Sequence, residues 1–135
     1  MMTPDTAQSL LSENFAGWVQ ALDLTVTAID AEQALIRMPL TPALARVGGI
    51  VCGQALAALA DTSMVLAAIA HIGEFKAIAT TDLHTQFLRP GSGSAILCEA
   101  RVVRAGRALI FARADMREES GGKLVATATA TFCVP

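Results

Sequence analysis

The chain has 135 residues, of which 53% are hydrophobic and 16% charged, and its net charge at pH 7 is −2. This composition excludes a disordered chain and predicts a single domain spanning residues 1–135. The lack of a Lys- and Arg-rich run argues against a partner that is a nucleic acid or a membrane surface. The N-terminus has neither a basic region nor a continuous apolar run, so we expect no signal peptide and a cytoplasmic location.

The first part of the chain predicts a helix followed by a hairpin of two strands. A short helix is expected from Asp5 or Thr6, either of which can cap it, to about Phe15. Hydrophobic residues then recur at every second position over residues 22–28 and 34–40. This alternation is typical of half-buried strands, and the short polar segment between them predicts a turn.

A long apolar helix is expected next, from Gly53 to about Ala70, with a length of roughly 27 Å at 1.5 Å per residue. It is apolar on nearly all sides, but polar residues such as Asp61 favour a buried helix of a globular domain over a membrane span. His71 suits the negative pole at the end of this helix, and Gly73 suits its termination.

Only strand patterns follow the helix. They cover residues 75–90, 94–104, 108–118 and 123–134. On the first of them, the alternation places Leu83 and Phe87 on one face. The other face would carry Thr80, Asp82, His84 and Gln86. A sheet of these strands encloses one side of the long helix, and in so small a chain the other side is most simply covered by a second subunit.

The segment GGIVCGQALAALAD places Gly49, Gly53, Leu59 and Asp61 at a glycine-rich helix entrance followed by one carboxylate. Together with TTDLHTQFLRPG and RVVRAGRALIFARADM further along the chain, it resembles the hotdog thioesterases of the phenylacetate-degradation type. The resemblance covers about residues 18–132. It implies an α+β hotdog fold, in which a long antiparallel sheet wraps one central helix.

The same resemblance implies an acyl-CoA thioesterase that needs no metal and no cofactor, since coenzyme A is part of the substrate. Asp61 would act as general base or nucleophile, and the free N–H of Gly53 at the positive end of the helix would polarise the carbonyl. Thr80 would help to position the water, and Gln54 would offer an amide near the carbonyl. Burial would raise the pKa of Asp61 and make it a better base.

Asp61 lies eight residues beyond Gly53, roughly 12 Å along the same helix, which is too far for both to act on one carbonyl. In the hotdog dimers that the sequence resembles, two such helices run antiparallel, so that Asp61 of one subunit faces Gly53 of the other. We therefore expect a homodimer to be needed for the site, either alone or assembled into a dimer of dimers.

Arginines after the long helix are candidate contacts for the phosphates of coenzyme A, because the guanidinium group offers a planar fork of donors. Arg89 ends one strand, and Arg104, Gly106 and Arg107 form a tight turn. The resemblance implies that this edge binds the nucleotide. The alternative interpretation is that these arginines lie on a hairpin exposed to solvent and bind no ligand.

The remaining reactive side chains are expected to be structural. Cys52, Cys98 and Cys133 are odd in number and widely spaced, which indicates reduced thiols. Cys52 and Gln54 stand where the resembled family often has His and a second Gly, and Cys52 is expected to pack or to line the pocket. His71 and His84 show no metal-ligand spacing, and neither is expected to be catalytic.

The N-terminal segment is expected to close the acyl end of the pocket, as the layout of the resembled family implies. The side chains concerned are Leu10, Leu11, Phe15 and Trp18.

Other interpretations stay open at this stage. Asp61 could be a structural carboxylate that Ser, Thr or backbone groups satisfy. A hotdog hydratase or dehydratase is disfavoured, because no His lies near the helix entrance. A non-catalytic acyl-CoA-binding or sensing module would keep the pocket and the arginines but would need no carboxylate in the helix.

Overall fold

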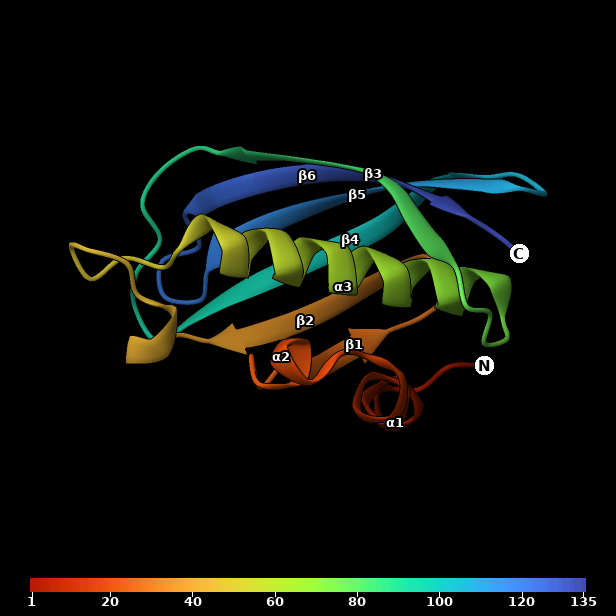
Figure 1. Cartoon of the computed structure of the whole chain (residues 1–135), viewed down its shortest axis with the longest axis horizontal. Coiled ribbons are helices and arrows are strands. Elements are labelled where there is room, and N and C mark those ends of the chain that lie inside the picture. Colours follow the sequence, from red (N-terminus) through yellow and green to blue (C-terminus); the bar gives the residue numbers. More distant parts are fainter.

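The computed structural model describes all 135 residues as an antiparallel sheet curved around one long helix (Figure 1). The helices are α1 (Pro4–Asn14), α2 (Gly17–Gln20), the 3-10 turn η1 (Pro42–Leu44) and α3 (Gly53–Ile72). The strands are β1 (Thr25–Ile29), β2 (Gln33–Pro39), β3 (Ala79–Phe87), β4 (Ala95–Ala105), β5 (Leu109–Glu118) and β6 (Leu124–Cys133).

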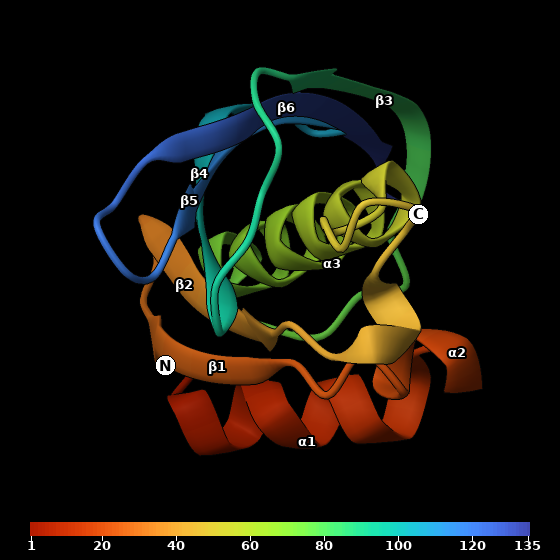
Figure 2. The same cartoon turned by 90° about the vertical axis from the view of Figure 1, so that its left-hand side faces the viewer.

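The six strands form one sheet in the order β1-β2-β4-β5-β6-β3, and every neighbouring pair is antiparallel. Seen end-on, the sheet curls around α3, while α1 lies beneath β1 on the side away from α3 (Figure 2). Because β3 follows α3 in the chain but pairs with β6, the strand that begins after the helix closes the sheet at its far edge.

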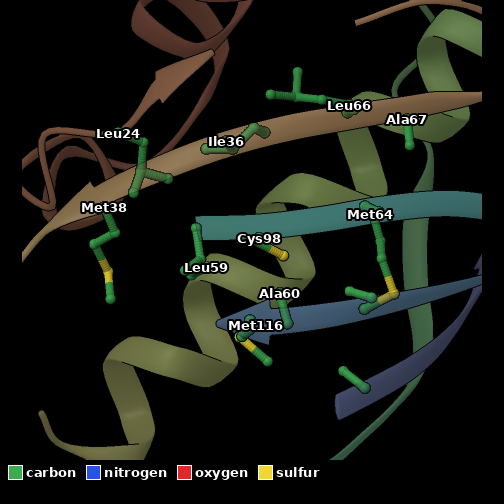
Figure 3. Close-up of a cluster of buried hydrophobic side chains, with 14 of the residues drawn as sticks. Leu24, Ile36, Met38, Leu59, Ala60, Met64, Leu66, Ala67, Cys98 and Met116 are labelled. Carbon is green, nitrogen blue, oxygen red and sulfur yellow. The ribbon is translucent and has the colours of Figure 1, made fainter. Parts of the chain in front are cut away.

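Small side chains on the inner face of the sheet allow α3 to approach closely. The buried alanines of this face are Ala34, Ala100, Ala112, Ala114, Ala126, Ala128 and Ala130. Larger side chains of the helix fill the space between: Leu59 and Met64 are fully buried and belong to the same core cluster as Cys98 and Met116 (Figure 3). This close packing explains why α3 is apolar nearly all round.

By length and composition alone α3 would pass as a membrane span, but 72% of its most apolar stretch is buried inside the domain. The expected role of this segment as a core helix is therefore confirmed. The helix ends at Ile72, two residues beyond the expected end, and Gly73 closes it in the left-handed conformation with φ of 90°.

The edge of the sheet at β1 is protected by α1. The side chain of Gln8 donates from Nε2 to the carbonyl of Leu24 at 2.8 Å and accepts from the N–H of Val26 at 2.9 Å. These two bonds occupy backbone groups at the sheet edge that would otherwise be free to pair with a further strand. Thr3 and Thr6 form a reciprocal capping box that fixes the start of α1.

The opposite edge, β3, is open. Most of its residues are exposed on both faces, and Leu83 and Phe87 leave 39% and 54% of their surface uncovered. A β-bulge between Thr80 and Asp82 interrupts its register with β6. Long, partly apolar open edges are rare on isolated domains, because they offer a template for pairing with another chain.

The predicted α+β hotdog architecture is confirmed, with small differences. The first strand begins at Thr25 rather than at residue 22, because α2 and a turn at Asp23, with φ of 58°, occupy the preceding segment. Leu22 and Leu24, expected in that strand, are nevertheless buried in the core. Neither α2 nor η1 was indicated by the sequence pattern.

Candidate active site

Asp61 lies in the middle of α3 and is held by a hydroxyl from β3. The hydroxyl of Thr80 donates to Asp61 Oδ1 at 2.9 Å. Alternation along the strand predicts Thr80 on the face of His84 and Gln86, and this prediction is wrong. The bulge between Thr80 and Asp82 shifts the alternation by one residue, so Thr80 pairs with the buried Phe132 and points toward α3.

The environment of Asp61 favours the protonated form of its carboxyl group. Partial burial raises the pKa of Asp61 above its usual value, and the hydrogen bond from Thr80 opposes this shift without cancelling it. A carboxylate with a raised pKa accepts a proton more readily at neutral pH. This arrangement suits a general base, one of the two roles that the resemblance implies for Asp61.

A pocket of about 450 Å³ opens beside Asp61 and Thr80. Its apolar lining comes from Phe15, Val65, Ile69, Phe75, Ala77 and Ile78. Two further polar residues, Asn14 and Lys76, complete it. Of the four N-terminal side chains expected to close this pocket, only Phe15 lines it. Leu11 points from α1 into the hydrophobic core, and Trp18 is 64% exposed.

Gly53 opens α3 at the other candidate centre. No side chain caps this end of the helix, and Leu56 is the first residue of the helix whose N–H finds a carbonyl, that of Cys52. The N–H groups of Gly53, Gln54 and Ala55 therefore remain free as donors at the positive end of the helix.

A second pocket, of about 370 Å³, surrounds Gly53. The ring of Phe87 packs against the glycine so closely that a Cβ added there would lie 3.2 Å from Phe87 Cζ. Arg46 and Arg89 also line this pocket, which brings two positive charges to the free helix end. Gln54 is exposed and does not line this pocket. Within one chain, the structure therefore does not bring its amide to the place predicted for it, beside a carbonyl at Gly53.

Neither of the two histidines lies in these pockets. His71 Nδ1 is 3.0 Å from the carbonyl oxygen of Ala31, which ties the end of α3 to the β1–β2 turn. His84 lies on the outer face of the sheet, in a shallow polar depression with Gln86 and Arg113. Burial raises the pKa of the Cys98 thiol to about 12, so this cysteine is an unreactive core residue.

The arginines predicted to bind coenzyme A do not gather in one chain. Leu109 and Ala79 both pair with Cys133, so the β4–β5 turn that carries Arg104, Gly106 and Arg107 lies at the Ala79 end of β3. Arg89 follows the opposite end. The nine residues of β3 separate them by roughly 30 Å. A single subunit therefore cannot present all of these residues to one nucleotide.

The two halves of the predicted catalytic machinery are likewise separate in one chain. The pockets around Asp61 and around Gly53 have no lining residue in common. The structure places Asp61 with Thr80, and Gly53 with Phe87 and Arg89. No role was predicted from the sequence for three residues that line these pockets, namely Arg46, Lys76 and Phe87. The position of Arg46, just before the glycines that precede α3, could have indicated that it lies near the start of the helix.

The sequence profile of the thioesterase superfamily matches residues 48–125, which include α3 and the strands β3, β4 and β5. The chain belongs to this superfamily. Membership supports thioester hydrolysis as the class of reaction and agrees with the hotdog fold. No curated protein matches the sequence.

Solved structures agree with this assignment. A candidate thioesterase from Silicibacter is 28% identical, with a TM-score of 0.88, and the match covers 100% of this chain and 93% of that one. A conserved protein from Pseudomonas aeruginosa is 27% identical, with a TM-score of 0.83 and coverage of 90% and 95%. A thioesterase from Haemophilus influenzae has the same fold at 24% identity, with a TM-score of 0.89 and coverage of 100% and 92%.

Proposed function

We propose that this protein is an acyl-CoA thioesterase of the phenylacetate-degradation type, acting on aromatic or short- to medium-chain acyl groups. The observation that carries the proposal is the carboxylate of Asp61, partly buried beside an apolar pocket and held by Thr80. A structural carboxylate in a core is normally satisfied on all sides. That of Asp61 has one protein partner and borders a space large enough for an acyl group.

The proposed reaction uses two half-sites, one formed by Asp61 with Thr80 and the other by the free N–H of Gly53. Asp61 takes a proton from water, and the water oxygen bonds to the thioester carbon while the carbonyl oxygen becomes negative. The N–H of Gly53 stabilises that oxygen. The intermediate then re-forms the carbonyl and breaks the C–S bond, and the departing thiolate takes the proton from Asp61. Direct attack by Asp61, giving an anhydride that water cleaves, uses the same groups.

A twofold dimer would unite the two half-sites. Within one chain, Asp61 meets Thr80 and Gly53 meets Phe87. If two β3 strands pair antiparallel about an axis near Leu83, Thr80 of one subunit lies opposite Phe87 of the partner subunit. Asp61 then approaches Gly53 of the partner subunit.

The open edge of β3 supports this assembly. Its exposed apolar side chains would be covered, and its unpaired backbone groups would find partners in the second strand. The same twofold axis reverses the direction of the partner. The β4–β5 turn of the partner subunit, with Arg104, Gly106 and Arg107, thereby comes to the end of the molecule that carries Arg89. The nucleotide of coenzyme A would then be held by residues from both subunits, and a dimer of dimers remains compatible with this pairing.

The test is thiol release from phenylacetyl-, benzoyl-, hexanoyl- and decanoyl-CoA by the wild type and by Asp61→Asn, which keeps the size of the side chain. We expect turnover by the wild type and a loss of about 10²–10⁴ in kcat for the variant, the contribution of a general base. An exposed acidic residue, Glu13→Gln, is the matched control. Equal turnover by the wild type and Asp61→Asn would contradict the proposal, and binding without turnover would favour an acyl-CoA-binding module.

A further inference from the structure

The pocket beside Asp61 contains two polar residues that the proposed mechanism does not use. Lys76 and Asn14 line it together with Phe15, Phe75 and other apolar side chains. Lys76 is the only cationic residue of this lining, and Asp61 is the only anionic one. A purely hydrocarbon acyl group would need neither a cation nor an amide in its pocket.

The ammonium group of Lys76 has no close ion-pair partner within the protein. Its only ion-pair partner is Glu74, whose Oε1 lies 3.8 Å from Nζ and whose side chain is 70% exposed. A pair that is so long and so exposed contributes little, so the ammonium group remains available to another anion. The side chain of Lys76 is only 37% exposed, which indicates that its stem is packed rather than extended into water.

Asn14 is held in place at the end of α1. Its Nδ2 donates to the carbonyl of Leu10 at 3.1 Å, which fixes the plane of the amide. The second N–H of this group and its oxygen have no partner in the protein, so both can serve a polar group in the pocket.

We propose that this pocket selects acyl groups that carry a carboxylate at the end far from the thioester, with Lys76 as its ion-pair partner and Asn14 as a further donor. The inference rests on the proposed thioesterase function, because it assigns the acyl group of that same site. Without Lys76, the carboxylate of Asp61 would repel such an acyl group. With it, a charge-assisted hydrogen bond becomes possible in a partly dry site.

The experiment compares adipoyl-CoA with hexanoyl-CoA, which have the same chain length and differ in the terminal carboxylate. The kcat and KM of both are measured for wild type, Lys76→Met and Lys76→Glu. Lys123→Met is the matched control, since Lys123 is the only other lysine and lies in the exposed β5–β6 turn.

We expect wild type and the Lys123 variant to prefer adipoyl-CoA about tenfold in kcat/KM, the size of one charge-assisted bond. Lys76→Met should abolish the preference, chiefly through a higher KM for adipoyl-CoA. Lys76→Glu should reverse it. Hexanoyl-CoA hydrolysed as well as adipoyl-CoA by the wild type would overturn this inference and leave the thioesterase function standing.

Calorimetric binding separates the two proposals if neither thioester is hydrolysed. Tighter binding of adipoyl-CoA than of hexanoyl-CoA, lost in Lys76→Met, would then support the carboxylate pocket while the proposed hydrolysis fails. Equal affinities would overturn the carboxylate pocket as well.

Discussion

Replacing Gly53 by proline isolates the role proposed for its backbone N–H. Proline removes that donor but is favoured at the first position of a helix, and its φ suits the start of α3. Cys52 already has φ of −72° and ψ of 150°, the conformation that a residue before proline prefers. No protein hydrogen bond is lost, because the N–H of Gly53 has no acceptor in the protein.

The matched control is Gly53→Ala, which keeps the N–H. Its Cβ would lie 3.2 Å from the ring of Phe87, so the ring must move by a few tenths of an ångström. Phe87 is 54% exposed, and such a movement costs little. The Cβ of proline meets the same ring, so the alanine variant accounts for the effect of that contact.

We expect Gly53→Pro to lower kcat by about 10²–10³ relative to Gly53→Ala, which corresponds to about 2.7–4 kcal/mol for one oxyanion donor. Its Tm should equal or exceed that of the wild type, since proline restricts the unfolded chain. The assay is thiol release under saturating acyl-CoA, with circular dichroism and gel filtration to confirm folding and assembly. A folded Gly53→Pro protein with the kcat of the alanine variant would refute the assignment of the oxyanion donor.

Because folding raises the pKa of Asp61, the folded state holds this proton more tightly than the unfolded chain, so the stability linked to it is present at low pH and is lost as pH rises through the raised pKa. Asp61→Asn should therefore have a higher Tm than the wild type at pH 7, and the difference should shrink toward pH 4 in calorimetry; a constant difference would contradict this. Thr80→Val removes the bond that lowers the pKa of Asp61, so the acidic limb of the kcat/KM profile should move to higher pH, while Thr80→Ser should leave it in place. Gln8→Leu should cost about 1–3 kcal/mol in urea unfolding, because Val26 N–H and the Leu24 carbonyl lose their partner at the β1 edge; an unchanged midpoint would show that water replaces the bonds.

The alternation of hydrophobic residues and the single long apolar segment were sufficient to predict one helix enclosed by a sheet, and the resemblance of three motifs to hotdog thioesterases gave the hotdog architecture. Strand periodicity reports which residues face a core, and one helix apolar on all sides requires a sheet around it. Asp61 was recognisable for the same reason, since a carboxylate in such a helix needs an explanation. The structure gives it a hydroxyl partner and a pocket.

Other features depend on pairings that no single segment encodes. The bulge that turns Thr80 toward Asp61 is a mismatch between β3 and β6, so the sequence of β3 alone puts Thr80 on the wrong face. The separation of Arg89 from Arg107 likewise depends on which strand lies beside β3. Lys76 follows a turn after α3, where periodicity gives no indication that its side chain lines a pocket.

The central claim is that each active site combines Asp61 of one subunit with Gly53 of the other, and subunit complementation tests it most directly. Asp61→Asn and Gly53→Pro proteins, each with a kcat lowered at least about 10²-fold, are dissociated, mixed in equal amounts and reassociated. Half of the dimers would be mixed, and one of their two sites would then contain both native residues, so we expect recovery of about one quarter of the wild-type activity. Activity that stays at the level of the separate variants, with mixed dimers demonstrated by mass spectrometry, would contradict a site shared between subunits.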